Sequence, residues 1–393
     1  MKSTMMTMYE ELCTCAVFSE VMEKPLFRLF EQYCLAEKGY EKRKVYAQFV
    51  SEIYENGGDL TSLVKRLVFE DENAYVKAVA AHKTVDGHIQ NSATRELEIL
   101  SRFAALTAEN FALDLGVDVE KLPQFTSFNA DMVASYNERL VNLHKYGYGI
   151  FSSACMFRLS DDKRIEPIVS ADKISMAQFI GYEAERQKIV ENTRAFVEGR
   201  PAANALLCGD AGTGKSSTVK AVANEFFNEG VRLIELRKDQ LRYLPLVMGK
   251  ISGNPLKFII FIDDLSFNQN NDDFSMLKAA LEGSASATAD NAVIYATSNR
   301  RHIVKESFAD REGDDVHRND TMQETLSLSE RFGLTVLYSK PSKQLYLKIV
   351  KELAARAHIT MDEKELELQA EAFALRKGSR SARSAEQFIN SLL

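Results

Sequence analysis

The chain has 393 residues, of which 45% are hydrophobic and 27% are charged, and its formal net charge is -7. This length predicts about two or three domains, and the composition is that of a globular protein. The excess of acidic side chains argues against a general nucleic-acid coat and against a polybasic membrane surface. No apolar run approaches the length needed to span a bilayer, so we expect a cytoplasmic protein with no membrane partner.

The cysteines give little indication of chemistry. There are five of them, an odd number, and no two are spaced as a C-x-x-C pair. This usage predicts neither a disulfide framework nor a zinc site. We therefore expect five reduced thiols.

Residues 1–170 are predicted to form a mainly helical N-terminal domain. Apolar residues recur there every three or four positions up to about residue 158. Gly57 and Gly58 interrupt the pattern, and either Asp59 or Thr61 can cap the helix that follows. The charged stretch 160–164, followed by Pro167, predicts a linker to the next domain. Since no catalytic constellation is visible in this region, its expected role is partner recognition.

Residues 171–341 are predicted to form an α/β core. Five short apolar runs alternate there with helical or loop segments, which indicates a five-stranded parallel sheet covered on both faces. Ligands of such sheets bind at the carboxyl ends of the strands. The expected strands are 204–208, 231–236, 258–262, 292–296 and 334–338.

The stretch that follows the first of these strands fits the phosphate-loop pattern G-x-x-x-x-G-K-[ST] over residues 209–216. Its glycines allow successive N–H groups to curl around an anion, and the helix that begins next adds its N-terminal dipole. In this pattern the lysine bridges the β- and γ-phosphates and the hydroxyl binds Mg²⁺. The expected nucleotide contacts are Gly209, Asp210, Ala211, Gly212, Thr213, Gly214, Lys215, Ser216 and Ser217.

Polar residues also follow two further strands. Asp263 and Asp264 end one apolar run, and we expect Asp263 to bind Mg²⁺ together with Ser216, while Asp264 polarises the attacking water. A solvated strand end or a helix cap would give the same pair of acids. Asn299 follows the next strand and is expected to position that water, with a simple turn residue as the alternative.

Together these motifs resemble the AAA+ ATPases over about residues 175–393, with 209–216 as Walker A, Asp263-Asp264 as Walker B and Asn299 as sensor 1. Residues 327–333 resemble the segment that carries the arginine finger, which makes Arg331 that finger. Residues 381–385 resemble the sensor 2 segment, with Arg383 as the sensor and Arg380 as the fallback. Residues 298–302, a charged insertion and residues 326–333 resemble more closely a bacterial branch, domain-of-unknown-function family 815.

The resemblance implies ATP and Mg²⁺ as ligands, with Gly181 and Tyr182 beside the adenine and a helical lid over 342–393. It also implies a homo-oligomer, a hexameric ring by analogy, in which Arg331 acts on a neighbouring subunit. An ion pair within the chain is the alternative for Arg331, and a solvated helix position is the alternative for Arg383. Most family members carry Glu where this chain has Asp264, so hydrolysis is less secure than binding.

Three functions follow from this interpretation. The first is an ATP-driven assembly or remodelling factor that acts on a protein or nucleoprotein client. The second is a switch or binding module that hydrolyses ATP slowly, and the third is a small-molecule kinase. A small basic cluster, Arg300, Arg301 and Lys305, leaves nucleic acid open as a partner, and the charged insertion 303–324 is expected to be a loop that nucleotide can order.

Overall fold

The computed structural model describes residues 3–37, 39–168, 174–265, 277, 281, 289–299 and 331–393. Three features of the sequence lie outside these residues: the charged insertion 303–324, the basic cluster at 300, 301 and 305, and the first part of the finger segment, 327–330. The chain divides into two compact units. One comprises Met1–Ser153 with Gly253–Pro255, and the other comprises Ala154–Ser252 with Leu256–Leu393.

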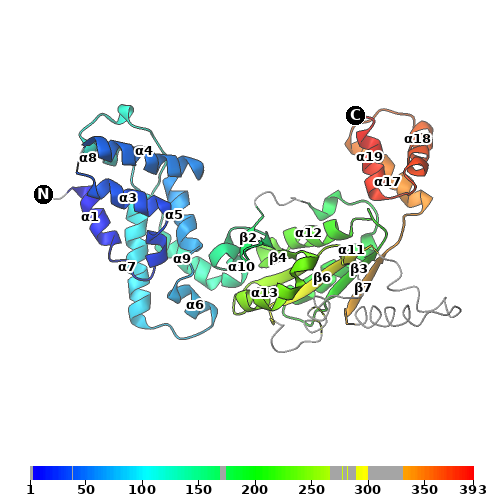
Figure 1. Ribbon diagram of the computed structural model, residues 1–393, viewed down its shortest axis with the longest axis horizontal. Coiled ribbons are helices and arrows are strands. Elements are labelled where there is room, and N and C mark those ends of the chain that lie inside the picture. Colours follow the sequence, from blue (N-terminus) through cyan, green and yellow to red (C-terminus); the bar gives the residue numbers. More distant parts are fainter. Residues whose placement is uncertain are drawn as a thin grey trace. The chain divides into compact units, whose positions relative to one another are not determined.

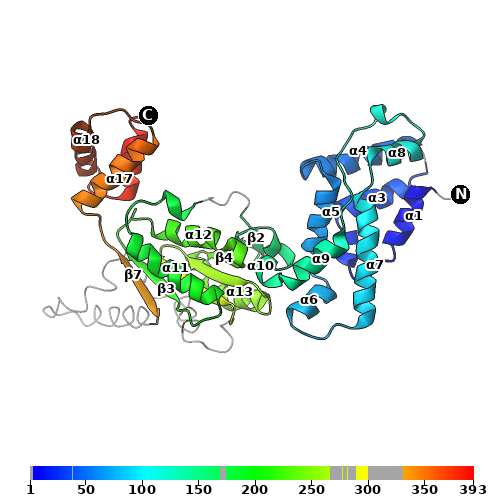
Figure 2. The same cartoon turned by 180° about the vertical axis from the view of Figure 1, so that it is seen from behind.

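The N-terminal unit is built from helices (Figures 1 and 2). Its core is rich in aromatic side chains: the rings of Phe30 and Phe103 lie 4.9 Å apart, and Phe49 and Phe111 lie 5.3 Å apart. Of the two caps that the sequence allows, Asp59 and Thr61, it is Asp59 that caps α5, by accepting a hydrogen bond of 2.6 Å from the Ser62 N–H. The elements are α1 Thr4–Leu12, α2 Ser19–Met22, α3 Pro25–Leu35, α4 Gly39–Glu55, α5 Leu60–Phe69, α6 Ala74–Ala80, α7 Gly87–Ala104, α8 Ala108–Leu115, η1 Val119–Lys121, α9 Met132–Val141, α10 Leu143–Tyr146 and η2 Gly149–Ser152.

The second unit contains a mixed sheet of seven strands in the order β2-β1-β4-β5-β6-β3-β7. All neighbours pair in parallel except β1 and β2. The α/β class with a mainly parallel sheet is thus confirmed. The strands are β1 Met156–Leu159, β2 Ile165–Pro167, β3 Ala205–Gly209, β4 Val231–Leu236, β5 Lys257–Ile262, β6 Ala292–Ser298 and β7 Leu334–Tyr338.

The prediction of five strands was wrong, because β1 and β2 lie in the region expected to be helical domain and linker. Residues 160–164 are the turn of the β1–β2 hairpin, closed by a hydrogen bond of 2.8 Å from the Ser160 N–H to the Arg164 carbonyl. β1 also pairs in parallel with β4, so this hairpin extends the sheet. Short strands around a charged turn resemble a linker when their pairing partners are unknown. Because the hairpin joins the sheet, the second compact unit begins at Ala154, before the expected domain start at residue 171.

Helices α11 (Glu183–Val197) and α12 (Lys215–Glu225) share a buried core with one face of the sheet. Ile189 of α11 and Val222 of α12 belong to this core with Leu207, Ile259 and Tyr295 from three strands. Strand residues that alternate with these, such as Leu206 and Ile260, are also fully buried, as a sheet covered on both faces requires. Further helical segments among the described residues of this unit are η3 Met176–Gln178, η4 Phe227–Glu229, η5 Lys238–Tyr243 and α13 Leu244–Ile251.

The C-terminal residues form three helices, α17 Lys343–Arg356, α18 Glu363–Arg376 and α19 Ala382–Asn390 (Figure 1). They have a core of their own that includes Tyr346, Val350, Ala370 and Phe388. All three lie within residues 342–393, where the resemblance implies a helical lid. None of the helices among the described residues has the length and apolar character that crossing a bilayer would require.

Strand register determines where the polar residues meet. Cys208 of β3 is opposite Ser298 of β6, and Gly209 is opposite Tyr338 of β7. β5 runs parallel to β6 and ends just before Asp263. The phosphate loop, the two acids and Asn299 therefore emerge together at the carboxyl edge of the sheet.

Candidate nucleotide-binding site

The phosphate loop begins at a backbone position that only glycine fits. Gly209 has a φ of 135°, and a Cβ there would lie 2.0 Å from the Tyr338 carbonyl oxygen of β7. The next residue, Asp210, donates its N–H to that same carbonyl at 3.1 Å. The close approach of β3 and β7 therefore sets the direction in which the loop leaves the sheet.

We expect Gly209→Ala to destabilise the folded chain by at least about 2 kcal/mol, because it adds a backbone clash to a strained φ. Gly249→Ala is the matched control, since Gly249 lies in α13 with open space around its Cα, and alanine favours helix there by roughly 0.5–1 kcal/mol. Urea unfolding of both variants measures the difference. Equal stabilities for the two variants would contradict this account of the loop.

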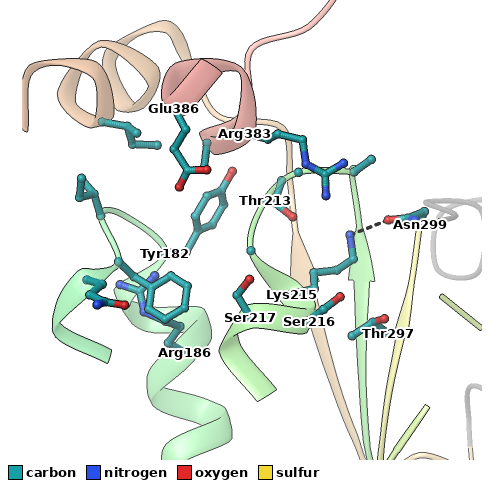
Figure 3. Close-up of a pocket in the computed structure, with 18 of the residues that line it drawn as sticks. Tyr182, Arg186, Thr213, Lys215, Ser216, Ser217, Thr297, Asn299, Arg383 and Glu386 are labelled. Atoms are coloured by element: carbon teal, nitrogen blue, oxygen red, sulfur yellow. Dashed lines mark hydrogen bonds between the residues drawn. The ribbon is translucent and has the colours of Figure 1, made fainter. Parts of the chain in front are cut away.

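Lys215, the first residue of α12, extends along the inside of the loop. Its Nζ donates to the carbonyl oxygens of Gly209 at 3.0 Å and Asp210 at 2.7 Å. It also donates to Oδ1 of Asn299 at 3.0 Å (Figure 3). Burial lowers the pKa of Lys215, and nearby acidic groups, Asp210 first among them, act in the opposite direction. The ammonium group is therefore held at the mouth of the loop, where an anion would replace neutral acceptors.

Asp263 lies beside the start of the same helix. Its Oδ1 accepts hydrogen bonds from the Ser216 hydroxyl at 2.6 Å and from the Thr297 hydroxyl at 2.5 Å. The sequence predicts the pairing of Asp263 with Ser216, and the two groups are in fact in contact. Thr297 was not singled out, although it lies within the polar end of the strand that leads to Asn299.

Asp264 adopts a left-handed backbone conformation with a φ of 51°, which directs it toward the neighbouring strand end. Its Oδ1 accepts a hydrogen bond of 2.7 Å from the side-chain amide of Asn299, and its N–H donates to Thr297 Oγ1 at 3.0 Å. Asn299 thus contacts both Lys215 and Asp264 through its two amide atoms. The structure brings these three predicted residues into one hydrogen-bonded chain.

A pocket of about 400 Å³ is lined by Lys215, Asn299 and Asp264, and its size suits a nucleotide. Its lining runs from Lys215, Asp263 and Asp264 to the apolar and aromatic side chains of Phe179, Ile180, Tyr182, Ile349 and Leu353. Loop residues 211–217 all line it, whereas Gly181, Gly209 and Asp210 are not among the lining residues. One end is therefore charged and polar, and the other is mostly apolar, with Arg186 beside the Phe179 ring.

The lid contributes Arg383 and Glu386, which point from α19 into the pocket (Figure 3). The Arg383 backbone N–H also donates to the Gly212 carbonyl at 3.3 Å. Arg380, the fallback for the sensor role, instead pairs with Glu371 through hydrogen bonds of 2.9 and 2.6 Å. Of the two arginines, Arg383 is the one that faces the pocket.

Arg331 lies at the opposite edge of the sheet. It precedes β7, whose first residue Leu334 is opposite Ala205 at the start of β3. Gly333 fits closely against Ala203, just before β3, so the segment is held at the amino ends of these strands. The five residues of β7 span about 16 Å, and Arg331 is not among the described residues that line the pocket.

A family model described as "Protein of unknown function (DUF815)" matches residues 152–393, more than half of the chain. The chain belongs to this family. The match spans the sheet, the pocket and the lid, begins within two residues of the second compact unit, and confirms the resemblance to family 815. No curated protein matches the chain.

Solved structures similar to this family member include RuvB of Thermotoga maritima, a Holliday junction branch migration motor. It is 14% identical, with a TM-score of 0.38, over 55% of this chain and 63% of that chain. A mutant of the same motor is 13% identical, with a TM-score of 0.38, over 55% of this chain and 64% of that chain. The chain covers less than two thirds of the length of these two structures.

Proposed function

We propose that this chain is an AAA+ ATPase that binds ATP with Mg²⁺ and hydrolyses it. The observation that carries the proposal is the hydrogen-bonded chain of Lys215, Asn299 and Asp264 beside the Ser216–Asp263 pair. It provides a cation for the phosphates, a hard oxygen pair for a metal, and a carboxylate with an amide for a water molecule. Release of phosphate from ATP by the purified full chain tests it.

The donor set suits Mg²⁺. The Ser216 hydroxyl and the Asp263 carboxylate are oxygen ligands within 2.6 Å of each other, and Mg²⁺ takes the rest of its shell from phosphate and water. The described residues offer no cluster of three or more His, Cys, Asp or Glu side chains that would hold a metal alone. When bound, the ion would neutralise charge that develops on the phosphates.

The remaining side chains have separate roles in binding ATP and in its hydrolysis. Loop N–H groups and Lys215 bind the phosphates, and Arg383 adds a cation from the lid. Asp264 accepts a proton from the attacking water, while Asn299 orients the carboxylate through its amide. Gly181 and Tyr182 are assigned to the adenine end, where Tyr182 lines the apolar part of the pocket.

Oligomerisation is part of the proposal because of where Arg331 lies. An arginine side chain is too short to reach from the amino edge of the sheet to the pocket at the carboxyl edge of its own chain. It can serve the pocket of a neighbouring copy through a heterologous contact, which closes into a ring. We take a hexamer as the working assembly, by analogy.

We expect Asp264→Asn to lower kcat by at least about 100-fold with ATP affinity retained, because the amide cannot accept the proton of the attacking water. Asp264→Glu, which introduces the glutamate that most AAA+ ATPases carry at this position, is the matched variant and should keep or raise kcat. Steady-state phosphate release and ATP titration of both variants test this. Equal kcat values for wild type and Asp264→Asn would remove Asp264 from the role of base.

The second candidate is a switch that binds ATP and turns it over slowly. The observation in its favour is Asp264 itself, whose carboxylate is one methylene shorter than the usual glutamate and is hydrogen-bonded to Asn299. Tight ATP binding without measurable turnover in the wild type would favour the switch. A small-molecule kinase is the least favoured function, since the described pocket is accounted for by one nucleotide.

The helical N-terminal unit is proposed to recognise the client, a protein or nucleoprotein. Its buried aromatic core makes it a compact unit that can carry such a surface. Binding of nucleic acid would be revealed by an affinity that falls steeply with salt, because phosphate contacts release counterions.

A further inference from the structure

The apolar end of the pocket is formed by a backbone segment in an unusual conformation. Gly181 and Tyr182 are consecutive residues with positive φ values, 76° and 58°. Tyr182 is 9% exposed, and its hydroxyl donates to the Ser339 carbonyl at 2.7 Å. A left-handed pair that includes a tyrosine is strained, and it persists only where surrounding groups hold it.

Arg186, one turn into α11, also contacts this segment, and Figure 3 shows it near Tyr182. It is a buried residue, 9% exposed, and lines the pocket. One guanidinium nitrogen donates to the Gly181 carbonyl, and Cζ lies 5.2 Å from the centre of the Phe179 ring. A buried cation is costly unless paired, and the carbonyl and the ring face provide compensating contacts.

Phe179 lies near the phosphate loop. Its Cε1 atom would be 3.8 Å from a Cβ on Gly214, so the ring faces the loop just before α12 across the space of one methyl group. The direct contact of the ring is with the guanidinium of Arg186. Displacing Arg186 would free both the ring and the Gly181 carbonyl, whereas the Lys215 ammonium bonds to Gly209, Asp210 and Asn299 and not to this segment.

We propose that Arg186 is a positioning residue for the nucleoside half of the ligand. It holds Phe179 and the segment Gly181–Tyr182 in the shape that receives the base, and it does not bind the phosphates. This inference rests on the proposed nucleotide site, and it divides that site into two parts that can be measured separately. One part recognises the phosphate chain, and the other recognises the nucleoside.

The test compares two ligands, ATP and inorganic tripolyphosphate, each with Mg²⁺, in calorimetric titrations of the full chain. Arg186→Met should weaken ATP binding by about tenfold and leave tripolyphosphate binding unchanged, because it removes one charged hydrogen bond and a ring contact at the base end only. Arg186→Lys keeps the cation and should recover part of the ATP affinity. Arg194→Met is the matched control, since Arg194 lies on the same helix over the Phe226 ring and away from the pocket lining.

An equal loss of affinity for both ligands would overturn the inference, as would unchanged ATP affinity in Arg186→Met. If that variant does not fold, Phe179→Leu carries the same test, because it keeps the arginine and removes the ring that it holds. Selective loss of ATP affinity in Phe179→Leu supports the inference, and loss for both ligands contradicts it. A wild type that binds neither ligand would overturn the proposed function itself. That result differs from one in which the wild type binds both ligands and the variants bind them equally well, which would overturn only the inference about Arg186.

Discussion

Arg331→Ala is expected to lower kcat for ATP by a factor on the order of 10³ or more while ATP binding to each subunit persists. The reason is geometric, because Arg331 precedes β7 at the amino edge of the sheet and the pocket lies at the carboxyl edge. The contacts described above for Lys215 and Asp263 do not involve Arg331. Phosphate release and ATP titration of the variant measure the two quantities separately.

Mixing two inactive variants gives the control for action between subunits. Arg331→Ala keeps an intact pocket, and Lys215→Ala keeps an intact Arg331, so a mixed oligomer contains some complete sites. We expect activity to reappear on mixing, whereas mixing Arg331→Ala with the Arg331→Ala, Lys215→Ala double variant should give none. Full activity of Arg331→Ala alone would contradict the role of Arg331, and no recovery on mixing would contradict its action in trans.

Lys215→Ala is expected to weaken ATP binding by a factor on the order of 10², because it removes the cation at the mouth of the loop and its charged hydrogen bonds to phosphate. In the structure its Nζ contacts two loop carbonyls and Asn299, all of which are neutral acceptors that phosphate can replace. Titration with ATP measures the loss.

Lys220→Ala provides the matched control, since Lys220 lies in the same helix, pairs with Glu235 at 3.5 Å and is absent from the pocket lining. That variant should bind ATP as the wild type does. Unchanged ATP affinity in Lys215→Ala would show that the loop does not hold the phosphates as proposed.

Much of the fold and the polar half of the site could be predicted from the sequence, for a physical reason. Residues 209–216, Asp263 and Asn299 each follow a short apolar run, and parallel strands bring their carboxyl ends to one edge. The contacts Ser216–Asp263 and Lys215–Asn299 follow from that placement.

Other features depend on pairings that a single sequence does not reveal. β1 has only four residues and β2 three, and the hairpin is placed in the sheet by the pairing of β1 with β4, which is distant along the chain. Arg186 resembles any surface arginine of an amphipathic helix until the fold buries it against Phe179. Thr297 could have been found, because it is a hydroxyl near the carboxyl end of β6, two residues before Asn299.

The measurement that tests the central claim most directly is phosphate release from ATP by the wild-type full chain, with and without Mg²⁺, together with an ATP titration under the same conditions. The account predicts ATP binding at micromolar concentrations and phosphate release that requires Mg²⁺ and is lost in Lys215→Ala. Absence of ATP binding at these concentrations, or phosphate release that persists in Lys215→Ala, would contradict it.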